Sequence, residues 1–597
     1  MSNHRSLKSR SLRCSLIIVV LAIYSYPALM TTANTGNHSL PPISAPDLSL
    51  YLNLSKMKTT NSAEVQDPYY GVSVPVPRLG YLKFRLAFLL FRSLSGMLHG
   101  NLCWSLFLWN LFWWGLLCVL ALWFFAEFLS IQTRELAFAG LAILMFLNLG
   151  ILRSQSAAWT HLPSLSKFQD LELPYIRPFF PQLPIPLLIL YLGLQMCALR
   201  KGGRGLWTAM GIVQLLAFAV FPYAMLMMAG ITAVGAFGYF TSPGNRAQWR
   251  TLLIYAIACA ICDALFFMRG GGIARTGAPG QYSLIHIQMS VLPHRIGGMW
   301  LMLTALTALL FFIRGSTSEV RWSLAGLGLS NLFLLSGDAF FSETALQVSH
   351  HGGYFVQLTA TVLLLFAASA GSRYLVKWKA AWRLALGVIT ALLIVNGTLV
   401  AHATYQVFLP LNREEAELTR FLQSEPPESD DLVIAHAEVV DDDCGWVPLV
   451  SRSHVLFCRS AQVLLSPEQN RQLQRFRQAI YLYFTNKDGR WMEQILDNPN
   501  AVKELTRLMF VGQFTTDVTQ RKRGEEAVRS DLLPLLARAE QHDPEVQAFF
   551  SHFRRVLVVD NADHPSFTSS RLAAYLKIEK QETFGDLLTL SCSSQTQ

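Results

Sequence analysis

The chain has 597 residues, of which 52% are hydrophobic and only 15% are charged. Because a soluble protein of this length would have about a quarter of its residues charged, the composition excludes a wholly soluble protein. The formal charge of +10 does not indicate a nucleic-acid partner, since Lys and Arg lie mainly in short turns between apolar runs, where they orient spans and meet lipid head groups.

The composition also changes along the chain, which predicts two domains. From Leu12 to His402 the sequence is a series of apolar runs, several of them near the roughly 20 residues that cross a bilayer. From Asn412 onward the composition is that of an ordinary soluble domain. We therefore expect a polytopic transmembrane domain over 1–406 and a soluble domain over 407–597.

The N-terminus is predicted to lie in the cytoplasm. The basic segment "RSLKSRSLRC" precedes the apolar segment "SLIIVVLAIYSYPALM", and a basic flank marks the cytoplasmic end of a first span. The same segment also fits a cleaved signal peptide, because small residues precede Asn34. In both cases the chain from Asn34 onward emerges on the outer side of the membrane.

A long first outer loop is predicted over 34–100. It contains Asp47 and Asp67 and ends in "YLKFRLAFLLFRSLSGMLHG", where Lys83, Arg85 and Arg92 have helical spacing. An apolar helix with one basic face lies in the membrane interface rather than across it. The sequence therefore predicts an interfacial helix at the end of this loop.

The remaining apolar runs bring the total to about eleven spans, and each turn assigned to the cytoplasm carries Lys or Arg. The run Leu206–Phe240 is too long for one span, and "FPYA" divides it into a hairpin. With this count the loops around Arg275 and His350, the first loop and the C-terminal domain are all extracytoplasmic. The other spans are predicted over Asn101–Phe128, Leu136–Leu152, Ile185–Leu199, Leu252–Met268, Ile296–Ile313, Trp322–Ser336, Tyr354–Ala370 and Leu384–Ala403.

Polar residues gather on the predicted outer face. An ionisable residue inside a span is a functional candidate, because burying it without a partner costs several kcal/mol; Asp263 is in this position. Acids in polar loops can instead cap a helix or stay solvated, so both interpretations remain open for the loop residues. The polar residues on the predicted outer face are the acids Asp47, Asp67, Asp263, Asp338 and Glu343, the histidines His350 and His351, and the arginines Arg85, Arg275 and Arg295.

The C-terminal domain is predicted to be a small α/β domain. "NREEAELTRFLQ" and "SPEQNRQLQRFRQAIYLYF" have helical patterns, and "DLVIAHAEVV", "SHVLFC" and "RRVLVVDNAD" have strand patterns. Alternation of strands and helices favours this class. The domain has no GxGxxG, P-loop or GxSxG motif, so we expect it to cover the membrane site or bind an acceptor.

The whole pattern resembles the GT-C superfamily of integral-membrane glycosyltransferases, in particular the bacterial type that uses polyprenyl-phosphate sugars. "APDLSLYLNLSKM" followed by "DPYYG" resembles the first outer loop of these enzymes, in which an Asp follows the first span. "GIVQLLAFAVFPYAMLMMAG" resembles their hairpin with a central Pro-Tyr, and "SHHGGYFVQLTATVLLLFAAS" resembles their late span with a polar, aromatic entry. The expected fold is therefore mainly α, with a GT-C-like membrane domain and an extracytoplasmic α/β domain.

The resemblance implies a hexosyl or pentosyl transferase that moves a sugar from a lipid-phosphate donor to a glycan or protein acceptor. Asp47 is the expected catalytic residue, since an outward carboxylate can accept the acceptor's proton. Arg85, Arg275 and Arg295 are expected to bind the lipid phosphate, and the acids and histidines above to support catalysis or bind acceptor. No cofactor is expected with certainty, although some members hold a divalent metal between two acids. The expected location is the bacterial inner membrane.

Two other functions stay open. The first loop lacks the adjacent Asp-Glu pair of several branches, and the gap between Met30 and Asp47 is longer than usual. These departures fit an inactive GT-C-like protein with a role in assembly or sensing. A transporter is the third reading, but it would show internal repeats and charges at mid-membrane, and neither is clear in this sequence.

Overall fold

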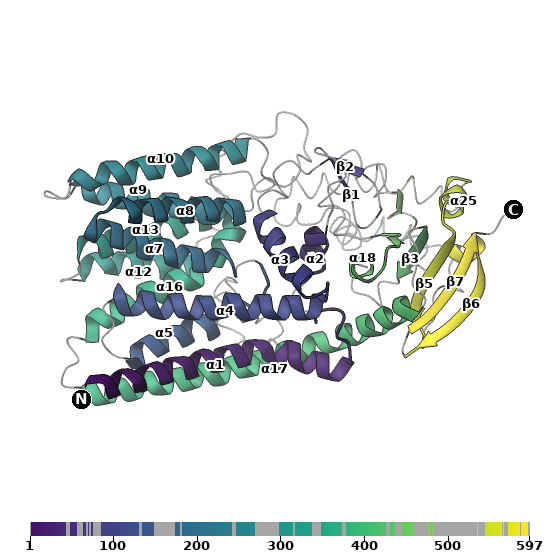
Figure 1. Cartoon of the computed structure of the whole chain (residues 1–597), viewed down its shortest axis with the longest axis horizontal. Helices are drawn as coiled ribbons and strands as arrows, with labels where there is room; N and C mark the ends of the chain where they lie inside the picture. The colour runs from purple at the N-terminus through teal and green to yellow at the C-terminus, as the bar shows by residue number, and fades with distance from the viewer. Residues whose placement is uncertain are drawn as a thin grey trace. The chain divides into compact units, whose positions relative to one another are not determined.

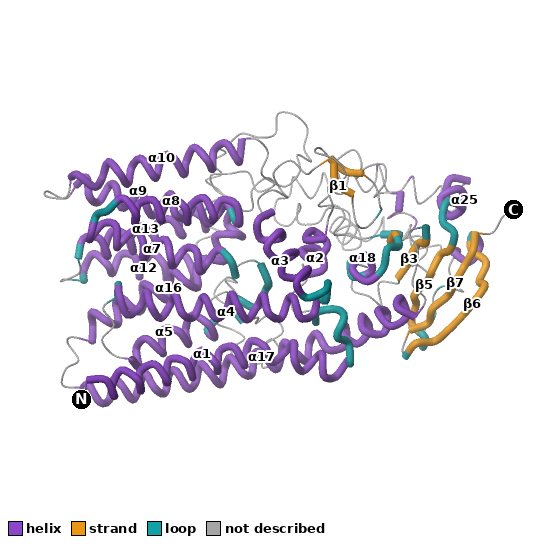
Figure 2. Tube along the Cα trace, in the orientation of Figure 1, coloured by secondary structure: helices purple, strands orange, loops and turns teal. Residues whose placement is uncertain are grey.

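The computed structural model is mainly helical, and the strands among its described residues form two sheets (Figures 1 and 2). The residues that it describes are 2–42, 48–56, 64–66, 70, 73–75, 85–129, 134–148, 173–179, 182–241, 246–268, 298–313, 317–336, 348–372, 378–424, 430–435, 445–457, 476–477, 480, 530, 534, 544–563, 565, 567, 571–585 and 587–594.

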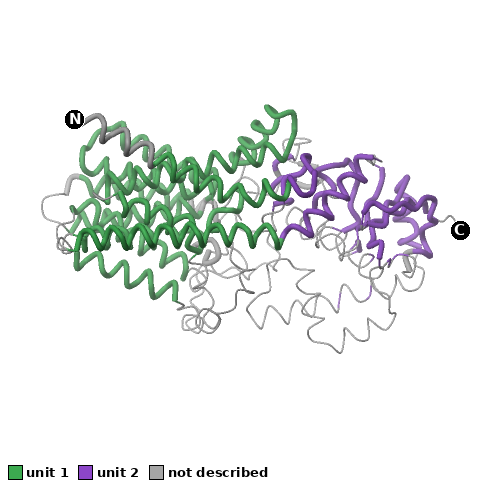
Figure 3. Tube along the Cα trace, turned by 90° about the horizontal axis from the view of Figure 1, so that it is seen from below, with its two compact units in different colours: residues 1–32, 82–272, 277–407 green, residues 33–81, 273–276, 408–597 purple. Residues whose placement is uncertain are grey.

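The chain divides into two compact units (Figure 3). The helical unit comprises residues 1–32, 82–272 and 277–407, and the C-terminal unit comprises residues 33–81, 273–276 and 408–597. The segment 33–81, which the sequence division grouped with the membrane spans, therefore belongs to the same compact unit as the chain's C-terminal part.

The helical unit is built from apolar helices that lie side by side (Figure 1). Five of the described helices contain a segment long and apolar enough to cross a membrane, namely Arg13–Thr35, Leu102–Glu127, Tyr223–Thr241, Gly353–Ser372 and Lys379–Ser424. The helices are α1 (Ser2–Thr35), α3 (Arg85–Met97), α4 (Leu102–Glu127), α5 (Arg134–Phe146), α7 (Pro184–Lys201), α8 (Arg204–Val220), α9 (Pro222–Thr241), α10 (Arg246–Met268), α12 (Gly298–Phe312), α13 (Ser318–Leu335), α16 (Val348–Ser372) and α17 (Lys379–Ser424), the last of which continues into the C-terminal unit.

The predicted division of the long apolar run Leu206–Phe240 is confirmed. Helix α8 ends at Val220, Phe221 is extended, and α9 begins at Pro222. Proline has no backbone N–H, so it cannot donate the hydrogen bond that would continue α8. At the first position of α9 this is no loss, because the N–H groups of a helix's first turn have no partner within the helix.

The predicted end of the last apolar helix is wrong. We expected a span to stop at Ala403 and a separate helix to begin after Pro410, whereas α17 runs unbroken through Pro410. Proline removes one hydrogen bond of the helix interior, but apolar side chains are buried on both sides of it, among them Leu409 and Ala416. Their burial keeps the chain helical across the proline.

Helices α9 and α13 approach each other closely because glycine occupies the contact. A Cβ atom at Gly326 would lie 2.7 Å from the carbonyl oxygen of Ile231 and 2.8 Å from its Cα. On the α9 side, a Cβ at Gly230 would lie 2.9 Å from the Cβ of Ser330. Small residues that let helix backbones approach are typical of helix packing in membranes.

Neutral polar side chains join four helices inside the helical unit. Tyr191 of α7 hydrogen-bonds Thr232 of α9 and accepts a 2.8 Å hydrogen bond from Gln214 of α8. Gln195 of α7 accepts from Thr232 at 3.3 Å and donates to Ser323 of α13 at 3.2 Å. Each bond satisfies groups that would be expensive to bury alone, so this network holds α7, α8, α9 and α13 together.

The C-terminal unit contains a mixed five-stranded sheet in the order β4-β3-β5-β7-β6 (Figure 2). Strand β3 pairs in parallel with β4 and β5, and β7 pairs antiparallel with β5 and β6. The elements are α2 (Leu48–Lys56), β1 (Glu64–Gln66), β2 (Ser73–Pro75), β3 (Asp431–Ala435), α18 (Val447–Val450), β4 (His454–Val455), α25 (Pro544–Ser551), β5 (Arg555–Asn561), η8 (Arg571–Ala574), β6 (Leu576–Phe584) and β7 (Leu587–Ser594).

The three predicted strands of this domain are confirmed as β3, β4 and β5. The final hairpin of β6 and β7 was not predicted. Most residues of β6 are exposed, and its sequence "LKIEKQETF" lacks the alternation of apolar and polar residues that marks a half-buried strand. The second predicted amphipathic helix, after Ser466, lies largely outside the described residues.

The contact of α9 with α13 predicts the effect of filling Gly326. Gly326→Ala should lower the melting temperature of the purified protein, because the added methyl meets backbone atoms of Ile231 that cannot rotate away. We expect the overpacking, about 1–3 kcal/mol, to exceed the gain in helix propensity of about 1 kcal/mol. Gly115→Ala in α4 is the control, since a Cβ there has no neighbour within 4 Å. An unchanged Gly326→Ala protein would contradict the close approach.

Candidate functional site

The predicted catalytic residue comes directly before a helix of the C-terminal unit in the sequence. Asp47 lies outside the described residues, and α2 begins with the next residue, Leu48. Asp67 also lies outside them, between the short paired strands β1 and β2. The first loop thus contributes a helix and a two-stranded sheet near its two predicted acids.

The other predicted site residues are not brought together by any described contact. Asp263 belongs to α10, His350 and His351 to the first turn of α16, and Arg85 begins α3, with no side-chain placement described for these four. The remaining residues, Asp338, Glu343, Arg275 and Arg295, lie outside the described part of the chain. Within that part, no group of three or more His, Cys, Asp or Glu side chains could hold a metal ion.

Helix α2 is packed into the C-terminal unit. Its side chains Leu48, Ser49, Leu52, Asn53 and Ser55 are buried, and those of Leu48, Leu52 and Asn53 have no exposed surface. A nine-residue helix is too short to be stable by itself in water. Its conformation therefore depends on this packing.

Two side chains of α2 bind the segment around α18. Asn53 Nδ2 donates a 2.6 Å hydrogen bond to the carbonyl oxygen of Gly445, and Lys56 Nζ donates a 2.8 Å hydrogen bond to that of Leu449. Partial burial of the ammonium group lowers the pKa of Lys56 from the ordinary lysine value. The ammonium group has thus given up part of its hydration to make this contact.

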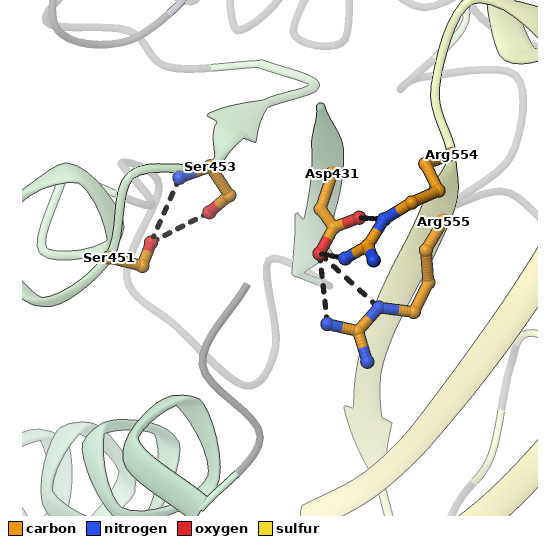
Figure 4. Close-up of polar contacts among 5 residues, drawn as sticks. All are labelled: Asp431, Ser451, Ser453, Arg554 and Arg555. Atoms are coloured by element: carbon orange, nitrogen blue, oxygen red, sulfur yellow. Dashed lines mark hydrogen bonds and ion pairs between the residues drawn. The ribbon is translucent and has the colours of Figure 1, made fainter. Parts of the chain in front are cut away.

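The segment after α18 is held by a serine turn. Ser451 Oγ lies 3.0 Å from the carbonyl oxygen of Val447 and 2.7 Å from Ser453 Oγ (Figure 4). Ser451 ends α18, and β4 begins at His454. Leu449, whose carbonyl oxygen accepts the hydrogen bond from Lys56, is therefore only five residues before strand β4.

A buried arginine joins the first loop to the sheet at a second place. Arg477 Nη1 donates a 2.8 Å hydrogen bond to the carbonyl oxygen of Val455 in β4. Its guanidinium carbon lies 4.4 Å from the ring centroid of Tyr70 and 5.1 Å from that of Phe549. A desolvated cation over an aromatic face is worth about 2 kcal/mol, so Tyr70 of the first loop is held on the C-terminal domain.

The predicted amphipathic helix is present as α3. Its residues Ala87, Phe88 and Phe91 are buried at the spacing of one helix face, whereas Leu89 and Leu90 are each 47% exposed. Arg92 is exposed as well. The helix thus leaves apolar and cationic side chains outside its packed face.

The buried face of α3 packs on an aromatic cluster. The rings of Phe91, Trp109 of α4 and Phe179 lie 5.3 to 5.6 Å apart in centroid distance, and Phe88 lies 5.5 Å from Phe179. Phe179 is fully buried with a φ of +67°. A bulky residue adopts this backbone only when its surroundings hold it there, so the cluster fixes α3 against α4.

A buried carboxylate with two partly exposed arginines joins β3 to β5. The carboxylate of Asp431 is fully buried and accepts hydrogen bonds from two arginines, at 3.2 and 3.3 Å from Arg554 and at 2.9 and 3.3 Å from Arg555 (Figure 4). The two parallel strands begin at this point. The geometry is that of a structural ion-pair cluster which sets their register.

The sequence did not reveal the packing of the first loop on the C-terminal domain. Asn53 and Gly445 are far apart in the chain, and no local pattern connects them. The available signal was the pair Asn53 and Lys56, three positions apart in a helix in which leucine occupies alternate positions from Leu48 to Leu54. Such a pair needs partners when the helix is buried.

Comparison of the sequence with protein-family models and with curated proteins gave no match. The chemistry is therefore inferred from the residues of this chain. They supply a helical unit with membrane-length apolar helices and a C-terminal unit that includes the segment carrying Asp47.

The charge cluster predicts a destabilising effect for Asp431→Asn. The change weakens the hydrogen bonds of a buried carboxylate to two guanidinium groups, and bonds to charged groups contribute about 1.5–3 kcal/mol. The arginine side chains are 51% and 24% exposed, so water takes up part of the charge that is left unpaired and the cost stays within this range. We expect faster hydrogen exchange of backbone amides in β3 and β5 of the full-length protein. Glu582→Gln is the control, because Glu582 pairs with Lys580 at the surface, and such pairs contribute at most about 1 kcal/mol. Equal exchange in both variants would contradict the structural role of Asp431.

Proposed function

We propose that this protein is a membrane glycosyltransferase that moves a sugar from a lipid-phosphate donor to a glycan or protein acceptor on the extracytoplasmic face of the bacterial inner membrane. The observation that carries the proposal is the packing of α2, which directly follows Asp47 in the sequence, into one compact unit with the C-terminal sheet. This loop follows the apolar helix α1 and precedes the other helices of the helical unit. The arrangement agrees with the GT-C resemblance of the sequence.

The contacts of the first loop support the predicted topology. Asn53 and Gly445 are hydrogen-bonded, so segments 33–81 and 408–597 must lie in the same compartment. Between these contacts the described part of the chain has ten apolar helices besides α3, from α4 to α17. If each crosses once, an even number of crossings returns the chain to the same side, and α1 adds the eleventh span.

Helix α3 supports a site at the lipid surface. Leu89, Leu90 and Met97 expose apolar surface, with 78% of Met97 accessible, while the cationic Arg92 is exposed on the same short helix. A helix with these properties partitions into the head-group region and attracts anionic lipid. The polyprenyl phosphate of a lipid-linked donor lies at this depth.

The proposed chemistry is an inverting transfer. The oxygen of the acceptor attacks C1 of the sugar and loses its proton to the carboxylate of Asp47, while the bond between C1 and the phosphate oxygen breaks. Negative charge then collects on the departing lipid phosphate. Arginine side chains stabilise such charge by paired hydrogen bonds, the role proposed for Arg85, Arg275 and Arg295.

Asp47→Asn separates catalysis from helix capping. If Asp47 accepts the proton, the substitution should lower turnover by a factor on the order of 10² to 10⁴. If Asp47 only caps α2, Asn is nearly as good a cap, and activity and stability should both stay near those of the parent. Sugar transfer is measured in membranes with equal amounts of protein, with Asp67→Asn and Glu343→Gln as parallel variants. Unchanged transfer by Asp47→Asn would remove Asp47 from the reaction and favour a non-catalytic role for the loop.

The topology predicts the location of the C-terminus. A reporter enzyme that is active only outside the cytoplasm, fused after Gln597, should be active, because the tail shares a compartment with the first outer loop. Fusion of the same reporter to a chain that ends after Lys201, which the predicted topology places in the cytoplasm, provides the inactive control. A silent reporter in a well-expressed full-length fusion would reverse the orientation and remove Asp47 from the outer face.

A further inference from the structure

A non-helical segment of the helical unit reaches the middle of a membrane-length helix. Residues 173–179, with the sequence "LPYIRPF", contain Pro174 and Pro178, and proline lacks the N–H of a helix and disfavours a helical residue before it. The carbonyl oxygen of Tyr175 accepts a 2.8 Å hydrogen bond from Trp114 Nε1, and Trp114 is at the midpoint of α4. Within a membrane, non-helical backbone is tolerated only where protein covers it or where it lines a water-filled cavity.

Helix α5 ends at a similar level, and its end is paired. The carbonyl oxygens of its last three residues accept hydrogen bonds from Gln357, Tyr24 and Asn396, at 3.3, 2.6 and 3.0 Å. The ring of Tyr24 lies 4.9 Å from that of Trp114, measured between centroids. The last carbonyls of a helix have no partner within it, so side chains of three other helices satisfy them here. The end of α5 therefore needs no ligand.

Three side chains at the non-helical segment differ from this pattern. Trp109 Nε1, the hydroxyl of Tyr175 and Gln182 Oε1 have no hydrogen-bond partner among the described residues, although each residue is at most 5% exposed. Gln182 Nε2 donates to Asn110 Oδ1 at 3.0 Å and to the carbonyl oxygen of Tyr175 at 3.3 Å, which fixes the amide that carries Oε1. Trp109 precedes Asn110, and its ring centroid is 5.3 Å from that of Phe179. The three residues thus belong to one region, where α4 meets the non-helical segment.

The hydrogen-bonding capacity of these atoms specifies the ligand. An indole N–H only donates, an amide oxygen only accepts, and a phenol hydroxyl does both. An ammonium ion could not accept from Trp109, and a phosphate or carboxylate ion could not donate to Gln182, whereas a hydroxyl group does both. Arg177, in the same segment, already has a partner, and the three unpaired groups carry no charge.

We propose that Trp109, Tyr175 and Gln182 form a binding site for a neutral, hydroxyl-bearing ligand inside the helical unit. Buried polar groups in proteins are nearly always hydrogen-bonded, and such a ligand supplies the partners that these three side chains require. Ordered water and the hydroxyl groups of a sugar share this chemistry.

The test is hydrogen exchange over residues 173–179 in full-length Tyr175→Phe protein, in a detergent without a sugar head group. The substitution removes one oxygen atom. If that oxygen binds the ligand, exchange should become about 5-fold faster, the effect of losing one hydrogen bond of ordinary strength. If the hydroxyl has no ligand, phenylalanine removes a buried unpaired group, and exchange should be unchanged or slower. That second result would overturn the site. Trp109→Phe, which removes the indole N–H and keeps an aromatic ring, should also speed exchange.

Tyr191→Phe is the matched control, because the Tyr191 hydroxyl has protein partners in Thr232 and Gln214. It should speed exchange in α8 and α9 and leave residues 173–179 unchanged, which calibrates the effect of one lost hydroxyl.

Methyl glucoside and methyl mannoside, added separately, distinguish the two sources of the hydroxyl group. Slower exchange over 173–179 in the parent protein, without the same response in Tyr175→Phe, would assign the site to a sugar. Faster exchange in Tyr175→Phe without a response of the parent to either glycoside would assign it to water. Neither measurement requires transfer activity, so the site and the proposed function can fail independently.

Discussion

The hydrogen bond from Asn53 to Gly445 is the contact on which the interpretation of this protein depends. It joins the segment after the first apolar helix to the domain after the last one, and both must therefore be in the same compartment. A buried side-chain amide has few alternatives to its partner, so the contact specifies one arrangement of α2. Any membrane that the chain crosses between these two segments must therefore be crossed an even number of times.

The helical unit has the properties of a rigid support. Gly326 and Gly230 bring α9 and α13 into close approach, and hydroxyls and amides, rather than charges, join α7, α8 and α9 in the interior. A transport pathway through a membrane uses ionisable groups near its middle. Along the described parts of α7, α8, α9 and α13 this network is neutral and its members are paired with one another, so its hydrogen bonds hold the four helices together.

The place of Asp47 in the sequence, directly before α2, fits two roles that have different chemical requirements. A helix cap needs only a side-chain oxygen that accepts a backbone N–H, whereas a general base needs a negative charge in reach of a substrate hydroxyl. Asn53 and Lys56 hold α2 on the segment around α18. The charge of the Asp47 side chain is the property that separates the two roles, because only a general base needs it.

The sequence by itself determined the local elements. Apolar runs of near-membrane length predicted the helical unit, Pro222 predicted the break between α8 and α9, and the apolar strand patterns predicted β3, β4 and β5, because each of these signals is contained in a few neighbouring residues. Only the tertiary structure decided that α17 continues through Pro410, that the exposed strand β6 pairs with β7, and that α2 belongs to the C-terminal domain. These outcomes depend on burial against residues that are distant in the chain, such as Gly445 for Asn53. A local sequence pattern does not indicate such distant partners. Tertiary packing, and not the intrinsic propensity of the residues, therefore decided these three outcomes.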